Sequence, residues 1–335
     1  MKSPVFPPPD NPWPKLRSYP LHLLLFLVTL LTATWAGAEW AGKSPLITNT
    51  DDFTLFMKAG LPYSLSLLGF LTVHEFGHFF AAMHHRLRAT LPYYIPIPPF
   101  PNFLNIGTMG AVIRIKEPIS STRILFDTGS AGPLAGFVVA LGLLVYGFLT
   151  LPPEAHVATD TSLPGVPGTL VFGKSLLFTL LESLLAPDAS LPMTELYRHP
   201  FLFAGWIGCF VTALNLLPVG QLDGGHVIFA MFGDRSHRRI ANGFLIAIVL
   251  LGAPAFISEF VTALFPDITL PIPEAVLRHS WPGWLFWAFI LKQFIGVRHP
   301  VVPIRQRLSA GRTIAGWFCI AMFILTFIPM PFDIL

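Results

Sequence analysis

The sequence has few charged residues and almost no cysteine. Only 12% of its 335 residues are charged, whereas 53% are hydrophobic and the mean hydropathy is +0.64. An ordinary soluble domain carries about 25% charged residues, so this composition argues against a soluble protein. The two cysteines, Cys209 and Cys319, both lie inside apolar segments, which excludes a disulfide framework.

The chain also lacks a charged tail and a long polar stretch. Its net charge of +3 is spread over short loops, so the charge bears on membrane orientation and we expect no nucleic-acid partner. No polar stretch is long enough to fold alone. We therefore expect a Pro-rich segment at 1–19, one polytopic membrane domain at 20–331 and a short tail at 332–335.

Apolar segments of membrane-crossing length recur along the chain. A helix needs about 20 residues to cross a hydrocarbon core of about 30 Å. We expect an all-α integral membrane protein with seven transmembrane helices, at 21–35, 60–80, 130–151, 201–217, 240–265, 281–295 and 314–328. The apolar segment 169–185 contains Lys174 and Glu182, so it is interpreted as an interfacial or partly buried helix.

The first apolar segment has a second interpretation. Ala36-Gly37-Ala38 resembles the small-residue cleavage site of a signal peptide. The long Pro-rich stretch before the segment favours a retained helix instead.

Basic and acidic loops alternate along the chain. The N-terminal segment and the loops 84–129, 234–239 and 298–312 are basic, and the loops between them hold mostly acids. Seven crossings reproduce this alternation. The positive-inside rule then places the N-terminus in the cytosol and the C-terminus outside, and we favour a bacterial inner membrane.

The second apolar segment contains the sequence His74-Glu75-Phe76-Gly77-His78, an H-E-x-x-H pattern. On a helix His74 and His78 are one turn apart and face the same side, so both imidazoles can bind one Zn²⁺, with Glu75 beside them as general base. Ionisable side chains are energetically costly within a membrane helix, so they usually indicate a functional site. The alternative is that they only form hydrogen bonds with neighbouring helices.

The fourth apolar segment closes on a sequence from Asn215 to Gly225 that contains Pro218. Proline and three glycines favour a broken helix or re-entrant turn, which at membrane depth must be buried in protein or line a wet cavity. Asp223 in such a turn needs a cation, which makes it the candidate third zinc ligand. The alternative is that Asp223 caps the next helix.

Asn215 has two interpretations of its own. Its amide either donates to the carbonyl oxygen of a substrate or forms a hydrogen bond across helices. His84, His85 and His226 are close in sequence to the candidate ligands, but we assign them no role. His78 and Asp223 both lie within about 10 to 20 Å of a basic loop, so both should enter the membrane from the same side.

Two weaker patterns lie between the candidate ligands. The strand-like sequence 106–115 predicts a small membrane-associated β-hairpin, which either offers an open edge to an unwound substrate or only plugs one face of the protein. Gly132, Gly136 and Ala140 place small residues every four positions, which predicts close helix packing.

The pairing of H-E-x-x-H with N-x-x-P-x-x-x-L-D-G resembles the site-2 protease family of intramembrane zinc metalloproteases, most closely its short bacterial and plastid-type members. The resemblance covers a catalytic core at 60–232. This chain differs from many members of the family in having no inserted PDZ or CBS domain. The resemblance implies that His74, His78 and Asp223 bind one zinc, that Glu75 activates water, and that the substrate is a membrane-anchored protein cut in or near its spanning segment.

Two other functions are weighed against this one. A di-iron desaturase needs further histidine boxes, and the remaining histidines are scattered. A non-proteolytic metal-binding protein, either a transporter or an inactive chaperone-like homologue, has no need of Glu75 beside two ligands.

Overall fold

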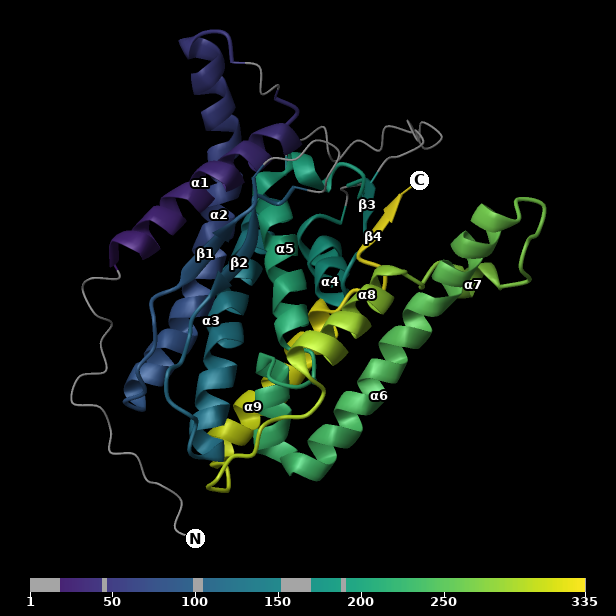
Figure 1. The fold of residues 1–335 in the computed structure, drawn as a ribbon. Coiled ribbons are helices and arrows are strands. Elements are labelled where there is room, and N and C mark those ends of the chain that lie inside the picture. The colour runs from purple at the N-terminus through teal and green to yellow at the C-terminus, as the bar shows by residue number, and fades with distance from the viewer. Residues whose placement is uncertain (1–18, 44–46, 99–104, 152–169, 188–190, 335) are drawn as a thin grey trace.

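The computed structural model describes residues 19–43, 47–98, 105–151, 170–187 and 191–334, and within them the chain is mostly helical (Figure 1). The predicted Pro-rich segment 1–19 lies outside the described residues except for Tyr19. The elements are α1 (Tyr19–Trp40), α2 (Thr50–His84), β1 (Tyr93–Pro96), β2 (Thr108–Val112), α3 (Thr122–Leu149), β3 (Leu170–Phe172), α4 (Leu176–Leu185), η3 (Leu196–Arg198), α5 (Pro200–Asn215), α6 (Asp223–Leu264), α7 (Glu274–Leu277), α8 (Gly283–Ile290), the π-helical turn η4 (Leu291–Ile295), α9 (Ala310–Thr326) and β4 (Phe332–Ile334).

Four helices in the described part of the chain are long and apolar enough to cross a membrane, namely α1, α2, α3 and α6. They carry the first, second, third and fifth predicted segments. The predicted segments at 201–217, 281–295 and 314–328 fall instead on shorter apolar helices, α5, α8 with η4, and α9. Length and composition therefore identify four of the seven predicted crossings.

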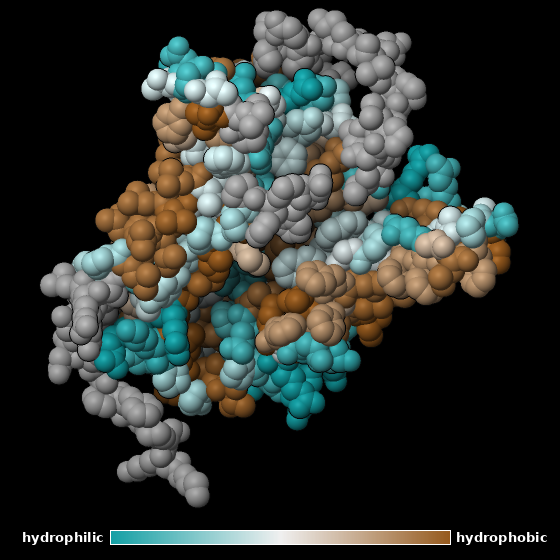
Figure 2. Space-filling view, turned by 45° about the horizontal axis from the view of Figure 1, so that its top comes forward, coloured by the Kyte–Doolittle hydropathy of each residue, from teal (hydrophilic) through white to brown (hydrophobic). Residues whose placement is uncertain are grey.

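Large apolar side chains are exposed on the outer helices. Leu23, Leu24 and Leu31 on α1 are 57 to 60% exposed, and the second half of α6 exposes Leu250 and Phe260 among others. Figure 2 shows hydrophobic residues in broad patches between hydrophilic residues at the top and bottom of the view. Such a surface is expected where lipid, rather than water, surrounds a protein.

The long helix α6 begins at the candidate ligand Asp223 and is bent at Gly233, whose φ of 79° interrupts the helical backbone. Only glycine adopts this conformation at little cost. The sequence predicts a basic loop at 234–239 and a helix from residue 240 onward, and it offers a short helix after Asp223 only as the alternative in which Asp223 caps it. The structure joins these parts into one bent helix. Beyond the bend α6 slants away from the other long helices (Figure 1).

Helices α2 and α3 lie against each other through small residues. A Cβ atom added to Gly77 would come within 2.5 Å of the Ala131 carbonyl oxygen, so the two backbones are nearly in contact. Gly132 and Gly136 on α3 face the side chains of His78 and His74 on α2. The close packing predicted from the small-residue spacing is confirmed, and it brings α3 directly against the histidines of α2.

Strands β1 and β2 pair antiparallel, with Tyr94 opposite Ala111 and a register shift between Tyr94 and Pro96. Both Tyr94 and Ala111 are buried in the main core. The Tyr94 hydroxyl lies 2.7 Å from the Thr72 hydroxyl of α2. These contacts fix the strand pair beside the helix that carries the H-E-x-x-H sequence.

An ion cluster joins three helices near the basic loops. The guanidinium of Arg312 on α9 donates two hydrogen bonds of 2.7 Å to the Asp127 carboxylate on α3. His85, at the end of α2, lies 2.8 Å from the same carboxylate. Asp127 therefore ties the first residues of α9 to the α2–α3 pair.

Replacing Asp127 by alanine is expected to lower the melting temperature measurably, because Arg312 and His85 lose their shared acceptor. Loss of a partly buried, charge-assisted contact costs about 1 to 3 kcal/mol. Glu274→Ala is the matched control, since Glu274 pairs with Arg278 one turn along the chain with both side chains exposed, where such pairs contribute about 0.5 kcal/mol. The melting temperatures are measured by thermal unfolding of the two detergent-purified variants. Equal decreases in both would contradict a structural role for the cluster.

Candidate metal centre

The two histidines of α2 project from one face of the helix. Their Nε2 atoms lie 3.2 Å apart and their ring centroids 4.9 Å apart. His74 is almost fully buried, with 2% of its surface exposed. The spacing of one helical turn thus produces the side-by-side imidazoles that the sequence predicts.

Asp223 reaches these rings from the first residue of α6. Its Oδ2 atom lies 3.3 Å from Nε2 of His78 and 3.6 Å from Nε2 of His74. The N-cap position is occupied by Leu222, and no side-chain capping bond is formed there. The carboxylate therefore faces the imidazoles rather than capping its own helix.

The three side chains have the chemistry and spacing of a zinc site. They are the one group of histidine, cysteine or acidic residues in the described ranges with all ligand atoms close together, within 4.8 Å of one another. Tetrahedral zinc with bonds of about 2.0 to 2.1 Å holds its ligand atoms about 3.3 Å apart. The separations here, 3.2 to 3.6 Å, match that value and leave one corner for water or substrate.

The outer nitrogens of the two rings differ in their surroundings. Nδ1 of His78 donates to the Thr128 carbonyl oxygen at 2.6 Å, which leaves Nε2 as the nitrogen with a free lone pair. Nδ1 of His74 is buried and has no hydrogen-bond partner among the described residues. Only His78 is therefore oriented by a hydrogen bond behind it, and His74 depends on packing.

Two glycines of α3 make room for the imidazoles. A Cβ atom on Gly132 would overlap the His78 ring, with Nε2 as the nearest atom. A Cβ atom on Gly136 would lie 3.0 Å from both Cβ and Nδ1 of His74. The small-residue spacing read from the sequence as scaffolding therefore also shapes the space that the histidines occupy.

The turn before Asp223 rests on a distant part of the chain. Gly220 has a φ of 56°, in the left-handed region, so glycine is favoured there. A Cβ atom at Gly220 would collide with the Gly296 carbonyl oxygen, and one at Gly224 would collide with the Leu216 carbonyl oxygen. The predicted broken backbone is tightly folded between these carbonyls.

Glu75 and Asn215 lie at the same site. Glu75 is buried, with 7% of its surface exposed, and lines one pocket together with all three candidate ligands. Asn215 is the last residue of α5, and its Nδ2 lies 3.2 Å from Nε2 of His74. Asn215 also lines the pocket, so both roles considered for its amide remain predictions.

The pocket in front of the ligands has a volume of about 330 Å³. One wall is formed by Ala111 and Val112 of β2 and by Ile113, the residue that follows the strand. The strand pair is therefore a wall of the candidate site itself.

His226, to which the sequence analysis assigned no role, also lines this pocket. The Pro300 carbonyl accepts from Nδ1 of His299 at 2.7 Å, so Nε2 of His299 accepts from Nδ1 of His226 at 2.8 Å. Burial lowers the pKa of His299, which favours its neutral form. This network assigns a lone pair to Nε2 of His226.

The sequence contained part of this information. His226 follows Asp223 by three positions, a spacing that places both residues on one helix face. The other part, the contact with His299, joins residues 73 positions apart and has no local signature.

Known proteins resemble this chain over most of its length. The probable chloroplastic zinc metalloprotease EGY2 of Oryza sativa subsp. indica is 30% identical over 295 residues, which cover 86% of this chain and 46% of that protein. The probable chloroplastic zinc metalloprotease EGY1 of Arabidopsis thaliana is 32% identical over 245 residues, which cover 69% of this chain and 42% of that protein. The chain thus spans about half the length of the curated relatives it matches.

No solved structure matches the chain significantly. The family model described as peptidase family M50 matches residues 62–257, a range that contains both halves of the candidate site. The resemblance to site-2 proteases is therefore confirmed: this chain belongs to peptidase family M50.

Proposed function

We propose that this protein is a membrane-embedded zinc metallopeptidase that hydrolyses peptide bonds in or near the spanning segments of membrane-anchored proteins. One observation carries the proposal: His74, His78 and Asp223 converge within ligand distance of one another, and Glu75 lies at the same pocket. The names of the relatives, zinc metalloproteases, agree with this chemistry.

In the proposed mechanism His74, His78 and Asp223 hold one zinc ion per chain. Bound zinc supplies a Lewis acid that polarises a peptide carbonyl and lowers the pKa of a coordinated water. Glu75 accepts the proton of the attacking water and passes it to the departing amine. Asn215 donates its amide to the substrate carbonyl oxygen as negative charge develops there.

The substrate enters along β2 in this proposal. A transmembrane helix hides each peptide bond in an i to i−4 hydrogen bond, so it must unwind before cleavage. The strand pair, as a membrane-associated hairpin, offers backbone groups next to the pocket to which an unwound segment can add as a further strand. Substrates with Gly or Pro near the cut site should unwind most easily.

The proposed arrangement keeps seven crossings, a cytosolic N-terminus and a bacterial inner membrane. Four crossings are the long helices, and the other three are the shorter apolar helices α5, α8 with η4, and α9. At 16 residues α5 is about 24 Å long, but its residues are mostly buried, so it crosses within protein rather than lipid. The alternating charges of the loops support the orientation.

Metal removal tests the function as a whole. The full chain, purified in detergent or nanodiscs, should contain one zinc and cleave single-span membrane proteins at internal peptide bonds. Chelation should abolish cleavage, and one equivalent of zinc should restore it. Zinc content and cleavage products are measured by elemental analysis and mass spectrometry.

The alternative function gives a different result in the same experiment. A transporter or an inactive chaperone-like homologue would bind the metal but produce no cleavage products from any of the single-span membrane proteins tested. That outcome, with zinc bound stoichiometrically, would reject proteolysis and retain the metal site.

A further inference from the structure

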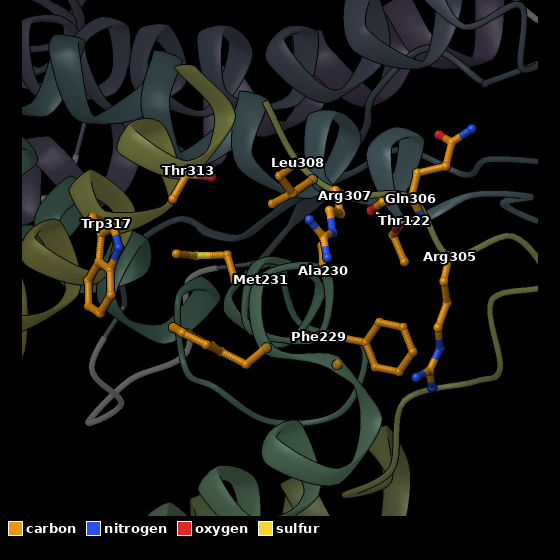
Figure 3. A pocket seen from close by; sticks show the side chains of 12 residues that line it. Thr122, Phe229, Ala230, Met231, Arg305, Gln306, Arg307, Leu308, Thr313 and Trp317 are labelled. Atoms are coloured by element: carbon orange, nitrogen blue, oxygen red, sulfur yellow. Dashed lines mark hydrogen bonds between the residues drawn. The ribbon is translucent and has the colours of Figure 1, made fainter. Parts of the chain in front are cut away.

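A second pocket lies outside the metal centre, between α6, α9 and the segment 305–308 that precedes α9. Its volume is about 460 Å³. Figure 3 shows Trp317 and Arg305 at opposite ends of the pocket, with Arg307 between them and Met231 on the side of Trp317. Trp317 and Met231 thus form an apolar end of the pocket, and the two arginines lie from its middle to its other end, where Phe229 accompanies Arg305.

The segment that carries the two arginines is held in place by its backbone. Thr122 at the start of α3 donates from its backbone to the Ile304 carbonyl at 3.1 Å and from its hydroxyl to the Gln306 carbonyl at 2.9 Å. Arg123 donates to the Arg307 carbonyl at 3.0 Å. The bases of both arginine side chains are thus fixed relative to α3.

Neither of these guanidinium groups is neutralised by a carboxylate among the described residues. Arg312 and Arg238, by contrast, are paired with Asp127 and Asp234. Arg305 and Arg307 are exposed and appear in no ion pair in the described ranges. Two unpaired guanidinium groups at one pocket favour a phosphate, which arginine binds with several hydrogen bonds at once.

An apolar groove adjoins this basic pocket. Its volume is about 330 Å³, and it shares Phe232 and Trp317 with the pocket as lining residues. The rings of Phe232 and Trp317 meet edge to face at 5.8 Å. The rest of the groove is lined by apolar side chains, among them Val227, Ile228, Ile320 and Ile324.

We propose that the pocket and the groove together bind one anionic glycerophospholipid. Its phosphate lies against Arg305 and Arg307, Trp317 stands at the boundary between headgroup and chain, and an acyl chain fills the groove. Tryptophan favours this boundary in membranes, and basic pockets between helices bind anionic headgroups. The groove makes a lipid, rather than free phosphate, the better match.

The groove also touches the support of the metal centre. Its wall includes Leu216 and Pro218 from the segment before Asp223 and Gly224 from the first turn of α6. A bound acyl chain would therefore pack behind the candidate zinc ligand. The lipid site itself does not depend on proteolytic activity and is testable without a substrate.

Native mass spectrometry of the full chain in detergent tests the site. Three probes are titrated: a short-chain phosphatidylglycerol, the phosphatidylcholine with the same chains, and inorganic phosphate. We expect one phosphatidylglycerol to bind more tightly than either of the others. The double variant Arg305→Gln/Arg307→Gln should weaken this binding about 30-fold, and the corresponding double lysine variant should weaken it less, because charge is retained.

Arg298→Gln is the matched control. Arg298 is an exposed arginine of the same basic loop, but it lines neither cavity. Its substitution should leave phosphatidylglycerol binding unchanged. Equal binding of phosphatidylcholine or of inorganic phosphate, an unchanged affinity in the double glutamine variant, or an equal loss in Arg298→Gln would each overturn the proposal.

Discussion

Replacing Glu75 by glutamine is expected to lower the rate of peptide cleavage by about 100-fold to 10,000-fold while zinc stays bound. The substitution keeps the size of the side chain but removes its ability to accept a proton, and general-base catalysis contributes an effect of this size. Glu75 is not one of the three side chains whose ligand atoms cluster, so the metal content should not change. Cleavage of a membrane-anchored substrate and bound zinc are measured on the same preparation.

Glu259→Gln serves as the control for Glu75→Gln. Glu259 is an exposed acid on the outer half of α6, so the same chemical change there should leave the rate unaltered. A Glu75→Gln protein that keeps its zinc and cleaves at the normal rate would show that Glu75 is not the base. Loss of zinc together with activity would instead assign Glu75 a role in holding the metal.

Replacing Gly132 by alanine is expected to weaken zinc binding by about 10-fold to 100-fold, although no ligand is changed. The new methyl group would occupy the space of the His78 imidazole, so the ring must move away from His74 and Asp223. Displacing a ligand through its surroundings costs affinity on this scale. Alanine is a better helix former than glycine, so α3 itself should not be weakened.

Gly142→Ala makes the same change on the same helix at a position with open space. Apart from the adjacent residues and the nearby backbone of α3 itself, no atom of the described residues lies within 4 Å of a Cβ atom placed at Gly142. Zinc affinity, measured by competition with a chelator, should be unchanged in this variant. If both variants bind zinc equally well, the close approach of α3 does not constrain the histidines, and our account of the small-residue spacing is wrong.

The sequence predicted the parts of the site that depend on local geometry. His74 and His78 are joined by one helical turn, so their common face follows from helix periodicity alone. Asp223 is a harder case, because its contact with them spans more than a hundred residues. Its prediction came from the loop charges, which placed both halves on the same side of the membrane, and from the cost of burying an unpaired carboxylate.

Other features had no such signal. The predicted segments 201–217 and 314–328 fall on α5 and α9, which at 16 and 17 residues are shorter than the four long apolar helices. The basic residues at 234–239 predict a loop, whereas in the structure α6 continues through them after the bend at Gly233. The cavity formed by Arg305, Arg307 and Trp317 arises only when α9 packs beside α6.

The contacts that support the turn before Asp223 limit how far this fold can diverge in sequence. Gly296 meets Gly220 from behind, and His299 holds the ring of His226, so a loop near the C-terminus supports residues more than 70 positions earlier. Chimaeras that exchange the part of the chain after α6 between relatives must therefore preserve both contacts across the junction. Divergence in that region is restricted by its fit to the turn, even though the region supplies none of the clustered ligands.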